Sequence, residues 1–127
     1  MKSKFSDKNI HWLANIDFTE LASLYGRAKF FWFPGTTYLG LIIMEAQSAG
    51  DVVLYYGMDG KSELIINEKT GFLVNDLEGM AKKTKVLIAN PQAIERMGLA
   101  ARENAKRFSR ENFRKNLVSA IDAVLKR

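Results

Sequence analysis

The sequence contains no cysteine and only one histidine, His11. Without thiols, the chain has no disulfide framework, no thiolate zinc site and no cysteine nucleophile. A single histidine also argues against histidine-rich metal sites and a Ser-His catalytic triad. His11 lies in an apolar run, and we interpret it as a structural residue. We expect a protein of a reducing compartment without a metal site.

Long apolar runs are missing as well. No segment reaches the ~18 consecutive apolar residues of a membrane span. Residues 1–7 are polar and charged, and no apolar signal-peptide core follows them. We therefore expect a cytoplasmic protein. With 2 prolines and 9 glycines in the chain, collagen-like and low-complexity architectures are excluded.

The 127 residues, 47% of them apolar and 26% charged, predict one globular domain over residues 1–127. Charge is unevenly spread: residues 1–75 carry 7 basic and 8 acidic side chains, whereas residues 76–127 carry 12 and 6. The basic part could contact an anionic membrane surface, which would make the protein peripheral. A solvated helical face is the simpler interpretation, because acidic residues are interspersed. We expect no nucleic-acid partner.

The apolar pattern predicts an alternation of strands and helices over residues 10–75, followed by helices alone. Short apolar or aromatic runs predict strands over Ile10–Ala14, Lys29–Phe33, Val52–Tyr56 and Gly71–Val74. Helices are predicted after an Asp17 cap, over Leu41–Ala49, Lys61–Ile66 and about 76–89, 91–107 and 110–126. We interpret Trp12 and Trp32, which fall on strands, as core or sheet-packing residues. The fold class is α/β, with a parallel sheet covered by helices.

Glu45 is the one acid in an almost wholly apolar helix, Leu41–Ala49, and its neighbours over Leu41–Ala46 are all apolar. Burying an unpaired carboxylate costs several kcal/mol, so such a residue is normally paired or meets a polar ligand. We expect Glu45 to be buried and to bind a ligand. Pairing with a backbone group or a lysine is the alternative.

Two loops follow predicted strands and lead into predicted helices, Pro34–Leu41 and Asp59–Glu63. The carboxyl ends of parallel strands meet at one edge of a sheet, where ligands bind. Free amides at a helix start favour phosphate. The stretch Gly60-Lys61-Ser62 is no P-loop, since Tyr55 stands where that motif needs its first glycine. Two such helix starts and one acid therefore predict a nucleotide-diphosphate site.

Three blocks of the sequence resemble the C-terminal domain of family-4 (group 1) glycosyltransferases. The family pattern is P-S-x-x-E-G-F-G-L-x-x-x-E-A-M-A-x-G-x-P-V-V, then G-G-x-x-E, then x-T-G-x-L-V. This chain has P-G-T-T-Y-L-G-L-I-I-M-E-A-Q-S-A-G-D-V-V, then D-G-K-S-E, then K-T-G-F-L-V. The resemblance covers residues 10–127 and implies part of a Rossmann-like GT-B half.

The resemblance implies retaining transfer of a sugar from a nucleotide-diphosphate sugar, without a metal or other cofactor. Glu45 matches the second acid of the family's pair, which holds the nucleotide ribose. Gly40 and Leu41 match the helix-start positions that face the diphosphate, and Gly60 and Glu63 match the block beside the donor. The remaining residues that we assign to the donor site lie in the same two loops: Gly35, Thr36, Leu39 and Lys61.

The chain departs from the family pattern at several positions. Thr37 stands where the first acid of the pair is expected, eight residues before Glu45. The loop before the helix is one residue shorter, Val52 replaces proline, and Asp59 replaces the first glycine of the second block. The family's upstream basic phosphate-binding residues, its first two strands and its acceptor domain have no counterpart.

Two functional hypotheses follow from these features. The chain is a glycosyltransferase donor-binding domain, inactive as an isolated chain, with Thr37 and Glu45 at the positions of the chemistry. Alternatively, it is a non-catalytic binding module that keeps a nucleotide-sugar pocket and docks on a partner chain or a membrane. Because the pattern lacks two central strands, we expect either a homo-oligomer or a partner chain that supplies the missing part.

Overall fold

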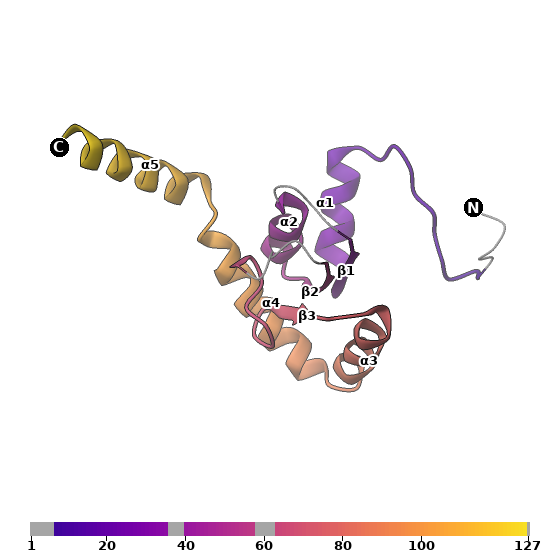
Figure 1. Ribbon diagram of the computed structural model, residues 1–127. Helices are drawn as coiled ribbons and strands as arrows, with labels where there is room; N and C mark the ends of the chain where they lie inside the picture. Colours follow the sequence, from indigo (N-terminus) through magenta and orange to yellow (C-terminus); the bar gives the residue numbers. More distant parts are fainter. Residues whose placement is uncertain (1–6, 36–39, 58–62, 127) are drawn as a thin grey trace.

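The computed structural model describes residues 7–35, 40–57 and 63–126. The elements alternate first and then become helical, as predicted (Figure 1). In chain order they are α1 (Phe18–Arg27), β1 (Phe30–Pro34), α2 (Leu41–Ala49), β2 (Val52–Tyr56), β3 (Gly71–Leu73), α3 (Leu77–Ile88), α4 (Pro91–Lys106) and α5 (Arg110–Leu125).

The three strands form a parallel sheet in the order β1-β2-β3, which confirms the predicted fold class. Phe30 pairs with Val52 at the start of β1, and Val53 pairs with Gly71 at the start of β3. The central strand β2 is buried on both faces of the sheet. This burial explains why its sequence is continuously apolar rather than alternating.

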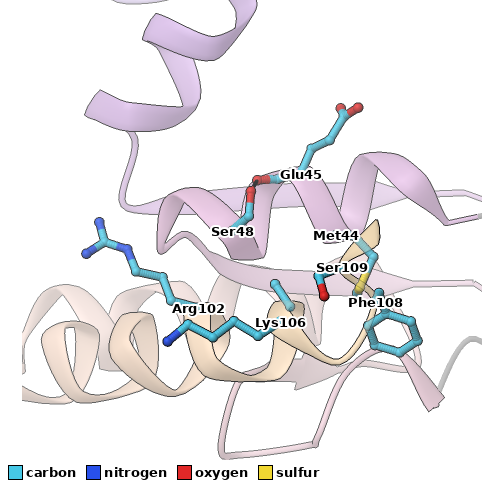
Figure 2. Close-up of a pocket in the computed structure, with 8 residues that line it drawn as sticks. Met44, Glu45, Ser48, Arg102, Lys106, Phe108 and Ser109 are labelled. Carbon is cyan, nitrogen blue, oxygen red and sulfur yellow. Dashed lines mark hydrogen bonds between the residues drawn. The ribbon is translucent and has the colours of Figure 1, made fainter. Parts of the chain in front are cut away.

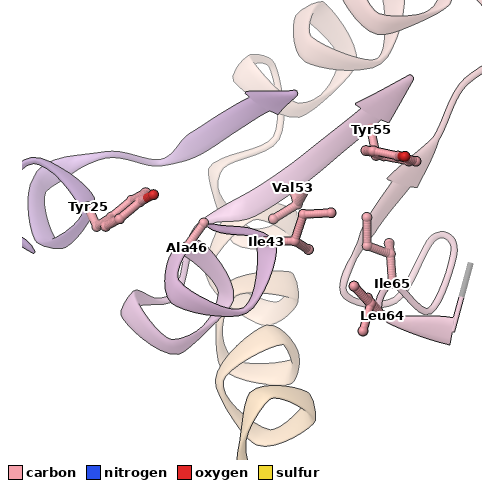
Figure 3. Packing of buried hydrophobic residues seen from close by; sticks show 7 residues of the cluster. All are labelled: Tyr25, Ile43, Ala46, Val53, Tyr55, Leu64 and Ile65. Atoms are coloured by element: carbon pink, nitrogen blue, oxygen red, sulfur yellow. The ribbon is translucent and has the colours of Figure 1, made fainter. Parts of the chain in front are cut away.

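Successive side chains of β2 point into two separate cores. Val53 and Tyr55 pack on the side of α1 and α2, whereas Val52 and Leu54 pack on the side of α3 and α4. Figure 3 shows the first of these cores, in which Ile43 and Ala46 of α2 lie against β2. The sheet is thus the middle of three layers (Figure 1).

Side-chain caps explain where most of the helices begin. Asp17 Oδ1 accepts from the Glu20 amide at 2.8 Å, and Ser109 Oγ accepts from the Asn112 amide at 3.2 Å. The Asp17 cap was predicted. Asp76 and Asn90 cap α3 and α4 in the same way. Each such cap satisfies an amide that has no partner inside its helix.

The strand predicted over Ile10–Ala14 is wrong. This segment extends away from the sheet, and Ile10, Trp12 and Leu13 are each about half exposed, at 48%, 50% and 53%. His11 is also exposed. The interpretations of His11 as a structural residue within a strand and of Trp12 as a core or sheet-packing residue are therefore wrong. An apolar run becomes a strand only where a neighbouring strand accepts its hydrogen bonds, and the described residues offer this one none.

Two further elements differ from expectation. In the stretch predicted as a helix over Lys61–Ile66, the described part begins with a 3₁₀ conformation at Glu63 and continues as an irregular segment in which Leu64 and Ile65 are buried. Trp32 is 48% exposed on β1, and its Nε1 donates to Thr84 Oγ1 of α3 at 3.0 Å. It therefore packs at the sheet edge rather than in the core.

The helix α5 projects from the rest of the molecule (Figure 1), and none of its residues is buried. Its Lys115 pairs with Glu111 at 2.9 Å, one turn apart on the same helix. The basic side chains of α5 thus lie on an exposed helical surface. No helix of the described part of the chain is long and apolar enough to cross a membrane.

Candidate functional site

The candidate site lies at the carboxyl edge of the sheet, where β1 leads into α2. Gly40 is the N-cap of α2 and has the left-handed backbone conformation, with φ +67° and ψ +14°. A Cβ on Gly40 would overlap Leu64 Cδ1, so glycine is needed both for the backbone and for the close approach. Among the described residues, no side chain caps α2. Its first amides therefore lie at a helix start suited to an anion.

Glu45 is exposed, so the prediction that it is buried is wrong. The buried residues of α2 are Ile43, Ala46 and Gln47, which are spaced to lie on one face of the helix. Glu45 falls on the opposite face. In Figure 2 its carboxylate points away from the side chains of α4. Glu45 is therefore available to a ligand without the cost of burying a charge.

A groove of about 480 Å³ runs beside Glu45, between α2 and the end of α4 (Figure 2). Apolar and polar side chains share its lining: Met44, Glu45, Ser48, Arg102, Ala105, Lys106, Phe108 and Ser109. The two cations already have partners, since Lys106 pairs with Glu103 and Arg102 donates to the Ala49 carbonyl oxygen. Of the predicted site residues that the structure describes, only Glu45 lines this groove.

The structure brings some of the predicted site residues together. Gly35 extends the pairing of β1, because its amide donates to the Tyr56 carbonyl oxygen at 2.8 Å. Leu41 is 61% exposed at the start of α2, and Glu63 is exposed next to Leu64. Thr36, Thr37, Leu39, Gly60 and Lys61 lie outside the described residues. A helix start is therefore described in only one of the two predicted loops.

A buried polar network joins α2, α4 and the segment after Glu63, and the sequence analysis missed it. Gln47 Nε2 donates to the Leu64 carbonyl oxygen at 2.8 Å, and Asn104 Nδ2 donates to the same oxygen at 2.9 Å. Asn104 Nδ2 also donates to Gln47 Oε1 at 2.8 Å. Gln47 is fully buried and Asn104 is 4% exposed. A helical projection of α2 would have shown that Gln47, not Glu45, shares the face of Ile43.

Asp51 is a second buried polar residue that the sequence analysis missed. It is fully buried at the start of β2, and neither carboxylate oxygen has a hydrogen-bond partner among the described residues. Burial raises the pKa of Asp51 to about 6, although the Arg102 charge acts in the opposite direction. Burial, Glu45 and Asp51 together raise the pKa of Tyr25. Asp51 lies at the amino edge of the sheet, opposite the candidate site.

The described residues contain no cluster of histidine, aspartate and glutamate side chains that could hold a metal ion. The chemistry available at the carboxyl edge of the sheet is instead a helix start, an exposed carboxylate at Glu45 and a second one at Glu63. Amides of this kind stabilise negative charge, and carboxylates accept hydrogen bonds from hydroxyl groups.

Comparison with known proteins gives the family. Residues 1–90 match the family described as "Glycosyl transferases group 1". The chain is 33% identical over 95 residues to sulfoquinovosyl transferase SQD2 of Arabidopsis thaliana, which covers 70% of this chain and 19% of the relative. It is 31% identical over 94 residues to a glycogen synthase of Mycobacterium tuberculosis, covering 72% of this chain and 23% of the relative.

The chain thus spans about a fifth of the length of these relatives. The family match extends from the N-terminal segment through the sheet and to the end of α3. It includes both loops at the carboxyl edge and the whole of α2. On this match and the parallel α/β architecture, the chain belongs to the group 1 glycosyltransferases.

Proposed function

We propose that this chain binds the donor of a glycosyl transfer, a nucleotide-diphosphate sugar, at the carboxyl edge of its sheet. The observation that carries the proposal is the start of α2 at Gly40, which follows the parallel strand β1 at the carboxyl edge of the sheet. Ligands of parallel α/β sheets bind at this edge, and phosphate favours such a helix start.

In this proposal Glu45 binds the ribose and Glu63 lies beside the donor sugar or diphosphate. Exposure of Glu45 supports its role, because an accessible carboxylate can accept hydrogen bonds from two neighbouring hydroxyl groups. The reaction of the complete protein would be a transfer with retention at the anomeric carbon. The amides at the start of α2 would stabilise the charge that develops on the departing diphosphate.

Binding without transfer by the 127-residue chain is the second candidate, and the replacement of an acid by Thr37 favours it. A partner is part of both candidates. Within the described part of the chain, β1 is an edge strand with one unpaired side, and such an edge attracts another strand. We propose that a second copy or another chain covers it, and that the basic C-terminal helices are available to an anionic membrane surface.

Titration calorimetry tests the proposal directly. The purified chain is titrated with uridine, adenosine and guanosine diphosphates and with their hexose conjugates. We expect saturable binding of one nucleotide series and weaker binding of the corresponding monophosphate, since the helix start favours the diphosphate. A control variant, Ser119→Ala on the exposed α5, should bind as the wild type does. No saturable binding of any of these compounds would overturn the proposal.

A further inference from the structure

Leu64 touches both of the sequence blocks to which we assign donor binding. Its side chain lies against Gly40, at the start of α2, where even a Cβ would overlap it. Along the chain, Leu64 directly follows Glu63. Leu64 is 6% exposed, so its position is set by what surrounds it. Any movement of Leu64 changes the distance between Gly40 and Glu63.

The main chain at Leu64 is held by two side-chain donors rather than by a helix or a sheet. Gln47 Nε2 and Asn104 Nδ2 both donate to its carbonyl oxygen, at 2.8 and 2.9 Å. Leu64 lies in a turn directly after Glu63, which has a 3₁₀ conformation, and no α-helix or strand fixes its position. Side-chain hydrogen bonds in a buried, water-poor environment are stronger and more directional than at the surface.

The two donors also orient each other. Asn104 Nδ2 donates to Gln47 Oε1 at 2.8 Å, and Arg107 Nη1 donates to Asn104 Oδ1 at 2.9 Å. These contacts fix the orientation of the side-chain amides of Gln47 and Asn104, because the oxygen of each already accepts a hydrogen bond. The chain Arg107–Asn104–Gln47 therefore connects α4 rigidly to α2 and to Leu64.

We infer that Gln47 and Asn104 are positioning residues that hold the two donor-binding blocks, Gly40–Glu45 and Glu63, in one fixed arrangement through Leu64. The inference rests on the proposed function for what the blocks bind, but the coupling itself is a property of the unliganded chain. Gln47 and Asn104 touch no ligand in this scheme. They act through the position of Leu64.

The variant Gln47→Met tests this inference. Methionine is unbranched and of similar size, the family pattern carries it at this position, and Asn104 still donates to Leu64, so the variant should fold. The matched control is Thr84→Val, which removes the acceptor of Trp32 Nε1 on the other face of the sheet. Each variant loses two side-chain hydrogen bonds, but only the first touches Leu64.

Hydrogen exchange of the unliganded chain is the first measurement. We expect Gln47→Met to raise the exchange rates of amides in residues 40–44 and 63–66 together by at least about fivefold, because the variant loses two hydrogen bonds and the loss of one already has an effect of this size. Thr84→Val should leave both segments unchanged. Unchanged exchange in both segments of a folded Gln47→Met variant would overturn the inference, whatever the chain binds.

A double-mutant cycle on nucleotide-sugar affinity is the second measurement. Gln47→Met should weaken binding by about fivefold, and in the background of Glu63→Ala it should have no further effect, since it acts by placing Glu63. Equal affinity of wild type and Gln47→Met, or fully additive losses, would contradict a positioning role. If the wild type binds no nucleotide sugar, the proposed function fails and the exchange measurement alone decides whether Gln47 couples the two blocks.

Discussion

Arg102 lies near enough to Asp51 to oppose the rise in its pKa, yet it gives its hydrogen bonds to a different group. Arg102 Nη2 and Nε donate to the carbonyl oxygen of Ala49, at 2.8 and 3.3 Å. A cation at the end of α2 satisfies a carbonyl that has no partner inside the helix. Asp51 is left buried without a described hydrogen-bond partner, and its burial therefore dominates its titration.

Asp51 should make the protein less stable as pH rises from about 4 to 6. Its pKa is raised to about 6 in the folded chain, whereas an exposed aspartate titrates near 3.9. Between these values the folded state binds more protons than the unfolded state, so the free energy of unfolding falls with pH. At about 1.4 kcal/mol per pKa unit, the loss is about 2–3 kcal/mol. Urea unfolding between pH 4 and pH 8 measures it.

The variant Asp51→Asn isolates this effect from other carboxylates. Asparagine has the shape of protonated aspartate and cannot ionise. The difference in unfolding free energy between variant and wild type should therefore be nearly constant below pH 4. It should move in favour of the variant up to about pH 6–7. A difference that does not vary with pH would show that Asp51 does not titrate as its burial implies.

Alanine substitution of two helical glycines should change the free energy of unfolding in opposite directions. Gly98 of α4 is buried, and a Cβ there would come within 2.5 Å of the Gly50 carbonyl oxygen. Gly98→Ala should force α2 and α4 apart and cost about 1–3 kcal/mol, the range for overpacking. Gly26 of α1 has nothing within 4 Å of its Cβ position. Gly26→Ala should stabilise the fold by about 0.5–1 kcal/mol through helix propensity.

Chemical denaturation of both variants checks the pair. The comparison is sharp because the substitution is the same, both sites are helical, and only the neighbouring atoms differ. Stabilisation by Gly98→Ala would mean that α4 does not pack against the end of α2 as closely as described here.

Local sequence patterns predicted most of the helices and strands correctly. They failed where the burial or pairing of a residue depends on its neighbours in space. The elements at Leu41–Ala49 and Val52–Tyr56 follow from apolar runs ended by glycine, and both are confirmed. Ile10–Ala14 is also largely apolar, but the sequence does not show whether a neighbouring strand is available to pair with it. Burial of Glu45 was inferred from composition alone. Which face of α2 meets β2 depends on how the helix is rotated about its axis. In the structure this rotation buries the Gln47 side chain and leaves Glu45 exposed.

The exposed position of Glu45 makes its ribose role separable from stability. Glu45→Ala should weaken nucleotide binding by about 1.5–3 kcal/mol, the range for hydrogen bonds to charged groups. Because Glu45 is exposed, the same change should alter the free energy of unfolding by less than about 0.5 kcal/mol. Calorimetric affinity and urea unfolding measure the two effects separately. Unchanged affinity would exclude Glu45 from the ribose contact.

The open side of β1 should make the chain self-associate. β1 reads Phe-Phe-Trp-Phe-Pro and carries no charged side chain, although charge is the usual protection of an edge strand. We expect light scattering to show a mass above 14.4 kDa that rises with concentration. Trp32→Lys should reduce association by placing a charge on the edge, whereas Leu117→Lys on α5 should not. A monomer at high concentration, or association unaffected by Trp32→Lys, would contradict this route.

The 127-residue chain by itself should transfer no sugar. Departure of a nucleoside diphosphate leaves an oxocarbenium-like sugar and a growing negative charge on phosphate, and binding energy helps only where it is greater in the transition state. The amides at the start of α2 can serve the phosphate. Family resemblance, however, adds basic side chains and an acceptor domain that have no counterpart in this sequence, and Thr37 replaces an acid.

Each of these differences raises the barrier. Losing one preorganised charge-stabilising donor costs about 3–4 kcal/mol, or about a hundred- to thousandfold in rate. An acceptor that is not held in place forgoes several kcal/mol more. We therefore expect Thr37→Glu alone to restore nothing, because it replaces one missing group out of several. Radiolabelled nucleotide sugars with water and simple sugars as acceptors provide the assay. Measurable transfer by the wild-type chain would mean that the start of α2 and Glu45 suffice, or that a second copy completes the site.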